Sequence, residues 1–195
     1  VTDVNSMKDP AFASLLKELK PDIFAVVAFR ILPQEILSIP RFGSYNVHPS
    51  LLPLYRGAAP IQWAIANGET KTGITIFKLS SVIDGGDIVR QERFDIGETE
   101  TAGELSNRLS FEGARILNSV ITDIGNGNTQ AFIQNNAMAT PAPKLKKEDG
   151  LVDFLMDADQ ICNRIRGFNP TPGSFTNFAG NQYMRNQVLS RIKTL

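Results

Sequence analysis

The chain has 195 residues, of which 42% are hydrophobic and 21% are charged, and this composition is typical of a folded globular protein rather than a disordered one. Twenty basic and twenty acidic residues give a formal net charge of +0, so the chain lacks the overall positive charge of many nucleic-acid-binding domains. No apolar run reaches the roughly 18 residues that a membrane span needs, and a single cysteine excludes an internal disulfide and is typical of a cytoplasmic protein.

The first part of the chain predicts helices and strands in alternation. Asp9 followed by Pro10 and an amphipathic apolar pattern predicts a helix that ends near residue 20. The apolar run 23–29 predicts a strand buried on both faces, as in the centre of a parallel sheet. A short helix over 33–37 and a second strand over 43–48 follow. A helix then begins at Pro60, where the missing N–H is tolerated.

The middle of the chain predicts two further strands and a long helix. Residues 73–79 alternate and are rich in β-branched side chains, and 88–94 form a strand that pairs with them as a hairpin-like neighbour. Thr101 and Glu104 have the spacing of a capping box, which opens a helix that ends at 125–127. The apolar residues of this helix are predicted to share one face, and they are Leu105, Leu109, Ile116, Leu117, Val120, Ile121 and Ile124. Strands that alternate with helices predict an α/β sheet with helices on its faces. The fold class is therefore α/β.

The composition changes after the long helix. We expect one domain over 1–135, a linker over 136–150 and the start of a second domain over 151–195. The linker has two prolines and no apolar periodicity. Beyond it, a short helix from Asp157 and strands over 175–178 and 182–192 are predicted.

Polar side chains gather where predicted strands end. Asn46 and the only histidine, His48, are two residues apart on a strand and therefore point to the same side. A carboxamide that donates to an oxyanion, beside an imidazole that exchanges a proton, suits acyl-type transfer. Asp84 would orient His48 if its strand is a neighbour of the first. A purely structural histidine, and Asp-Gly-Gly-Asp as simple turn chemistry, are the open alternatives.

Other catalytic and binding signatures are missing from the sequence. The chain contains no GxSxG nucleophile elbow, no Walker phosphate loop and no GxGxxG motif. One histidine and one cysteine also argue against a His/Cys zinc site, and we expect no metal.

Three motifs together resemble the folate-dependent formyltransferase family. They are Asn46-x-His48, the run Ser50-Leu51-Leu52-Pro53-x-x-Arg56-Gly57, and Asp84-x-Gly86. The stretches 56–62, 141–149 and 165–173 resemble the branch of that family that formylates methionyl initiator tRNA. The resemblance covers nearly the whole chain.

The resemblance implies a Rossmann-like formyltransferase sheet, followed by a linker and the start of a β-rich, OB-like C-terminal domain. It implies a soluble cytoplasmic monomer that transfers formyl from 10-formyltetrahydrofolate to the α-amine of initiator methionyl-tRNA. By position, the catalytic residues would be Asn46, His48 and Asp84, the folate site would contain Ser50, Leu51, Leu52 and Pro53, and tRNA contacts would come from Arg56, Lys144, Lys146 and Lys147. Asn46 and a protonated His48 would donate to the tetrahedral oxyanion while Asp84 holds the imidazole.

The same resemblance leaves two alternatives. A sugar-nucleotide amine formyltransferase would use the same three catalytic residues on an amino sugar. Relative to the family, the chain lacks an N-terminal β-α-β portion and most of the C-terminal domain, so a non-catalytic folate-binding remnant is the other alternative.

Overall fold

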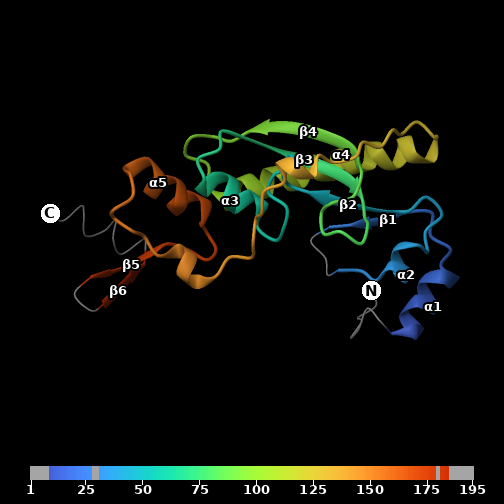
Figure 1. Ribbon diagram of the computed structural model, residues 1–195, viewed down its shortest axis with the longest axis horizontal. Helices are drawn as coiled ribbons and strands as arrows, with labels where there is room; N and C mark the ends of the chain where they lie inside the picture. The colour runs from blue at the N-terminus through green and yellow to red at the C-terminus, as the bar shows by residue number, and fades with distance from the viewer. Residues whose placement is uncertain (1–8, 28–30, 179–180, 185–195) are drawn as a thin grey trace.

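A four-stranded sheet forms the centre of the computed structural model, which describes residues 9–27, 31–178 and 181–184. Its order is β1-β2-β3-β4, with β1 at Phe24–Val26, β2 at Ser44–His48, β3 at Lys71–Lys78 and β4 at Ile88–Asp95 (Figure 1). Strand β1 is parallel to β2, whereas β2–β3 and β3–β4 are antiparallel. The α/β class and the hairpin-like third and fourth strands are confirmed, but the sheet is mixed.

The first strand differs from the sequence prediction. The apolar run 23–29 predicted a central strand with two buried faces, but β1 has three residues and stands first in the sheet order. Ala25 is exposed and Val27 is 58% exposed, because β1 has a partner on one side only among the described strands. Residues 28–30 lie outside the described residues.

Local sequence signals set the helix boundaries. The helices are α1 at Pro10–Glu18, α2 at Gln34–Leu37, α3 at Pro60–Ala66, α4 at Ala102–Gly125 and α5 at Ala158–Gly167. The Asp9 carboxylate caps α1 by accepting from the Ala11 N–H at 2.9 Å. The capping box of α4 is present, with the Thr101 N–H donating to the Glu104 carboxylate at 2.8 Å.

The main core lies between β3 and the apolar face of α4. Six consecutive residues of β3, 72–77, are buried. The strand lies between β2 and β4 in the sheet, and side chains of α4 pack against it. The α4 side chains that face it recur at helical spacing, as the sequence predicted. Fully or nearly buried members are Ile74, Ile76, Leu105, Leu109, Ile116, Val120 and Ile124.

The C-terminal elements lie at the end of the molecule opposite α1 and α2 (Figure 1). Helix α5 packs on α3, where the rings of Trp63 and Phe168 meet edge to face at 5.5 Å. Strands β5, Phe175–Phe178, and β6, Asn181–Met184, form an antiparallel pair. The remainder of the predicted strand 182–192 lies outside the described residues.

The segment between α4 and α5, which includes the predicted linker, contacts α3 and the loop before it. It contains two 3-10 turns, Asn136–Met138 and Lys147–Gly150, and Pro141 pairs in parallel with Arg56. The Trp63 indole N–H donates to the Pro143 carbonyl at 2.8 Å. Backbone groups of the predicted linker, 136–150, are therefore bonded to the loop before α3 and to the Trp63 side chain of that helix. No helix in the described ranges is long and apolar enough to cross a membrane.

Candidate active site

The only histidine lies buried at the end of β2. His48 is 4% exposed and pairs in register with Thr75 of β3. Its Nε2 lies 2.9 Å from the carbonyl oxygen of Tyr55. Because a carbonyl oxygen only accepts, Nε2 carries the proton of this hydrogen bond. Nδ1 is therefore the nitrogen left for proton exchange.

The carboxylate of Asp84 lies on the Nδ1 side of that ring. The Asp84 Oδ2 atom is 3.8 Å from His48 Nδ1, a distance for electrostatic attraction rather than a direct hydrogen bond. The same oxygen accepts from the Gly57 N–H at 2.8 Å. Asp84 belongs to the loop between β3 and β4, and the pairing of β3 with β2 brings this loop to His48. The neighbouring strands that the sequence required for a His48–Asp84 pair are thus present.

Burial decides the protonation of His48. It lowers the pKa of the imidazole below its ordinary value of 6.5, while the Asp84 carboxylate and the Tyr55 carbonyl act in the opposite direction. A lowered pKa favours the neutral ring at pH 7. The family resemblance implied a protonated His48 as oxyanion donor, whereas the lowered pKa favours a neutral imidazole whose Nδ1, on the Asp84 side, can accept a proton.

The lowered pKa also predicts a pH dependence of folding. Because the unfolded chain binds a proton at His48 more readily than the folded chain, stability contributed by this group falls as pH drops through the unfolded value of about 6.5. We expect the wild type to lose more unfolding free energy between pH 7.5 and pH 5.5 than a His48→Gln variant. Urea unfolding at both pH values measures the difference, and equal losses would contradict it.

Asn46 precedes His48 by two residues on β2 and is half-buried. It lies between Val26 of β1 and Phe77 of β3 in the sheet register. Alternation along the strand places its side chain on the same side of the sheet as the imidazole. The structure thus places all three predicted catalytic residues in one region, with Asn46 and His48 on β2 and Asp84 on the adjoining loop.

The predicted folate-site residues divide into two buried and two partly exposed. Ser50 is fully buried and its hydroxyl donates to the Leu54 carbonyl at 2.6 Å, which closes the turn after β2. Leu52 is 3% exposed, whereas Leu51 and Pro53 are partly exposed. The Ser50 and Leu52 side chains therefore shape the loop from inside, and Leu51 and Pro53 remain the candidates for direct contact with a ligand.

Arg56 and Gly57 join this loop to the segment after α4. The guanidinium of Arg56 donates to Gln134 Oε1 and to Asn136 Oδ1, so this predicted tRNA contact already has two protein partners. Gly57 has φ +127°, and a Cβ there would lie 2.5 Å from the carbonyl oxygen of Ala142. Arg56 thus holds the loop through its hydrogen bonds to Gln134 and Asn136. Gly57 allows the loop backbone to approach Ala142 closely.

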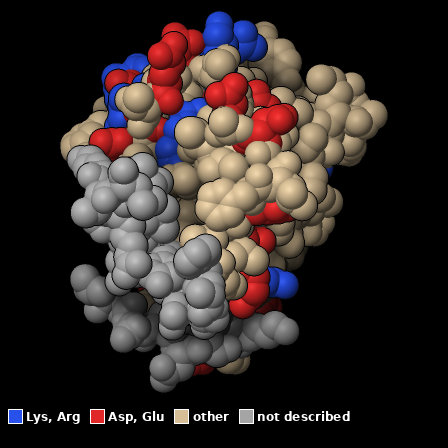
Figure 2. Space-filling model, turned by 90° about the vertical axis from the view of Figure 1, so that its left-hand side faces the viewer, with Lys and Arg blue, Asp and Glu red and all other residues tan. Residues whose placement is uncertain are grey.

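The three predicted lysine contacts are exposed. Lys144, Lys146 and Lys147 lie at the start of the C-terminal part, and the Lys147 ammonium is 5.8 Å from the centre of the Phe175 ring. On the face in Figure 2, the described basic and acidic side chains are interspersed rather than separated. The lysines remain a prediction for phosphate contact.

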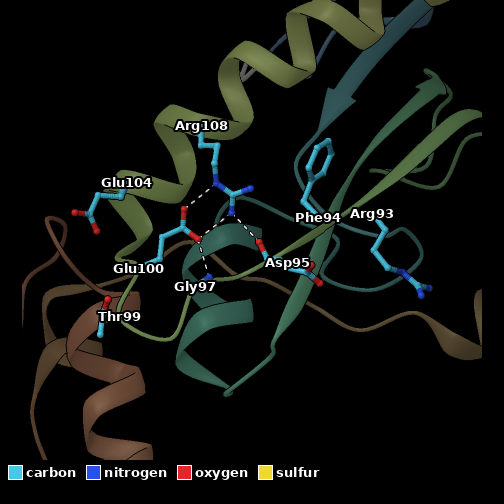
Figure 3. Close-up of a pocket in the computed structure, with 8 residues that line it drawn as sticks. All are labelled: Arg93, Phe94, Asp95, Gly97, Thr99, Glu100, Glu104 and Arg108. Atoms are coloured by element: carbon cyan, nitrogen blue, oxygen red, sulfur yellow. Dashed lines mark hydrogen bonds and ion pairs between the residues drawn. The ribbon is translucent and has the colours of Figure 1, made fainter.

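A surface pocket lies elsewhere in the described part of the molecule. It has a volume of about 820 Å³ and lies where β4 ends and α4 begins, lined by residues that include Arg93, Asp95 and Arg108. Figure 3 shows the Arg108 guanidinium clamped on Glu100, whose pKa this hydrogen bond lowers. None of the predicted site residues lines this pocket, and two of its charged side chains, Arg108 and Glu100, are paired with each other. Within the described ranges, no three His, Cys, Asp or Glu side chains are grouped to hold a metal ion.

Comparison with known proteins identifies the family. The model of the formyl transferase family matches residues 2–121, more than half of the chain. The chain belongs to the formyl transferase family. The model of the formyl transferase C-terminal domain matches residues 144–191, so both parts of the family are represented, and the β2–β3 site lies within the first.

Individual proteins and solved structures extend this comparison. The chain is 43% identical to the methionyl-tRNA formyltransferase of Geobacter metallireducens over 92% of its length, and spans 58% of that relative. A Helicobacter canadensis N-formyltransferase, solved with folinic acid and dTDP-3-aminofucose, is 26% identical with a TM-score of 0.63 over 70% of this chain and 52% of its own. HypX of Aquifex aeolicus, solved with tetrahydrofolic acid, shares the fold with a TM-score of 0.75 at 22% identity, over 90% of this chain and 31% of its own.

Proposed function

We propose that this chain is part of an enzyme that transfers the formyl group of 10-formyltetrahydrofolate to the α-amine of methionyl initiator tRNA. The 43% identity to a methionyl-tRNA formyltransferase over 92% of the chain carries the proposal. A folate-derived donor is further supported by the tetrahydrofolic acid and folinic acid in the two solved structures above.

His48 and Asp84 would move the proton of the attacking amine. The amine nitrogen attacks the formyl carbon, a C–N bond forms, and the carbonyl electron pair moves onto oxygen. His48 Nδ1 takes the amine proton, and the Asp84 carboxylate 3.8 Å away stabilises the imidazolium. Nε2 keeps its hydrogen bond to the Tyr55 carbonyl throughout, which fixes the ring.

Asn46 would stabilise the tetrahedral oxyanion through its carboxamide N–H. When the oxyanion collapses, the bond from the former formyl carbon to folate N10 breaks. The imidazolium returns its proton to that nitrogen, which leaves tetrahydrofolate and the formylated amine. The proton taken from one amine is thus given to the other, and His48 ends neutral, as its lowered pKa favours.

The residues proposed to bind the two substrates are those that match the family motifs in the sequence. Leu51 and Pro53, which are partly exposed beside β2, would contact the folate, with Ser50 and Leu52 holding the loop in shape. Lys144, Lys146 and Lys147 would contact tRNA phosphates, and Arg56 would act mainly by holding its own loop.

A nucleotide-linked amino sugar is the second candidate acceptor. The Helicobacter canadensis structure was solved with dTDP-3-aminofucose, and it is 26% identical to this chain. Transfer to an amino sugar would use the same attack, proton transfer and collapse. The higher identity to the tRNA enzyme favours the tRNA acceptor.

A parallel transfer assay decides between these acceptors. The longest reading frame that contains this chain is given 10-formyltetrahydrofolate with methionyl initiator tRNA or with a dTDP-amino sugar, and His48→Ala serves as control. We expect transfer to the tRNA alone and its loss in the variant. Transfer to the sugar alone would replace the acceptor, and folate binding without transfer to either would identify a non-catalytic remnant.

A further inference from the structure

One buried carboxamide connects the two loops that meet at His48. Gln134 follows α4 in the chain and is 5% exposed. Its Nε2 donates to the main-chain carbonyls of Asp84 at 2.8 Å and Gly86 at 2.7 Å. Its Oε1 accepts from Arg56 Nη2 at 2.6 Å and Nε at 3.1 Å. All the hydrogen-bonding capacity of a glutamine side chain, two N–H donors and one carbonyl acceptor, is used here.

These contacts are next to the atoms that orient the Asp84 carboxylate. Asp84 has φ +49°, in the left-handed region that residues other than glycine rarely adopt. Its carboxylate lies between His48 Nδ1 and the Gly57 N–H. The position of that carboxylate therefore depends on the main chain at residue 84 and on the loop that presents Gly57. Gln134 bonds directly to the first and, through Arg56, to the second.

We propose that Gln134 is a positioning residue for the His48–Asp84 pair, holding the Asp84 main chain in register with the Arg56-Gly57 loop. The proposal rests on the proposed function of this site. The Gln134 side chain contacts neither the His48 imidazole nor the Asp84 carboxylate; it acts through the main-chain carbonyl of Asp84. Misplacement of a catalytic group by about 1 Å is enough to lower turnover by about 100-fold.

The chemistry of the carboxamide separates its two roles. A glutamate in its place keeps an acceptor for the Arg56 guanidinium but has no N–H for the two carbonyls. A methionine has similar length and neither function. Gln134→Glu therefore removes the bonds to residues 84 and 86, and places a carboxylate oxygen against their carbonyls, while it keeps the Arg56 link; Gln134→Met removes both links without adding a charge. Gln130, on the same segment, is exposed and makes no side-chain hydrogen bond with the described residues, so Gln130→Met is the matched control.

The kinetic test uses the longest reading frame containing the chain. With formyl donor and acceptor near saturation, we expect kcat to fall at least tenfold in both Gln134 variants, with KM for the donor within threefold of wild type and Gln130→Met unchanged. Unchanged kcat in Gln134→Glu would overturn the proposal, because the bonds to the Asp84 loop would then be dispensable. If Gln134→Met does not fold, the kcat of Gln134→Glu, which keeps the Arg56 link, is the result that tests the proposal.

A titration of His48 separates positioning from general loosening of the fold. His48 is the only histidine of this chain, and its imidazole resonances are assigned by their absence in His48→Gln. If the Asp84 carboxylate moves away in Gln134→Met, the pKa of His48 falls further, because the attraction that opposes burial is weakened. An unchanged His48 titration in a folded Gln134→Met variant would overturn the proposal. This readout needs no turnover, so it remains decisive even if the wild type transfers no formyl group.

Discussion

Replacing His48 with glutamine is expected to lower kcat for formyl transfer by about 100- to 10,000-fold, the usual contribution of a positioned acid–base group. Glutamine retains an N–H that reaches toward the Tyr55 carbonyl but has no nitrogen that accepts a proton beside Asp84. The substitution thus removes proton transfer while retaining one bond of the buried side chain. Single-turnover rates with bound donor measure the chemical step.

Stability is the control for this loss of activity. The neutral histidine is buried at 4% exposure among apolar neighbours that include Phe77, whose ring meets the imidazole edge to face at 6.5 Å. We expect His48→Gln to cost about 1–2 kcal/mol of unfolding free energy, in the usual range for one altered buried hydrogen bond. A folded variant whose single-turnover rate stays within threefold of wild type would remove His48 from the mechanism.

The helices were predicted well because their boundaries depend on residues that are close together in the sequence. The Thr101/Glu104 capping box and the apolar spacing that follows fix the start and the buried face of α4. Two members of the predicted face, Leu117 and Ile121, are only partly buried.

The direction in which neighbouring strands pair could not be predicted from short stretches of the sequence. Strand–helix alternation suggested parallel strands, yet β2 and β3 run antiparallel although α3 lies between them. A connection of this length is compatible with either direction, and the choice depends on how the whole sheet buries β3. This choice also brings the β3–β4 loop, and with it Asp84, to His48.

The supporting residues of the site were missed for a similar reason. Tyr55 acts through its main-chain carbonyl, held at φ +60°, and Gln134 acts from a position 50 residues after Asp84 in the chain. Neither role depends on a spacing or on a typical catalytic residue type. By contrast, the Asn46-x-His48 spacing and the Asp84 turn are visible in the sequence, because the residue types of the proposed catalytic groups are themselves distinctive.

Gly57→Ala is expected to be strongly destabilising, by about 3 kcal/mol or more, because two separate costs add at this position. Its φ of +127° is unfavourable for any residue with a Cβ, and that Cβ would lie 2.5 Å from the Ala142 carbonyl oxygen. Relief of the overlap requires the loop and the segment after α4 to separate. The Gly57 N–H would then leave the Asp84 carboxylate, so kcat falls together with stability.

Two other glycines of this chain separate the two costs. Gly127 has φ +72° with no atom within 4 Å of an added Cβ, so Gly127→Ala carries the backbone cost alone, about 1–2 kcal/mol. Gly125, the last residue of α4, has neither an unfavourable φ nor a neighbour, and Gly125→Ala is expected to be neutral or to stabilise the helix by up to about 1 kcal/mol. Urea unfolding ranks the three variants. If Gly57→Ala is no less stable than Gly127→Ala, the close approach of Ala142 contributes nothing, and the segment after α4 does not constrain the loop beside His48.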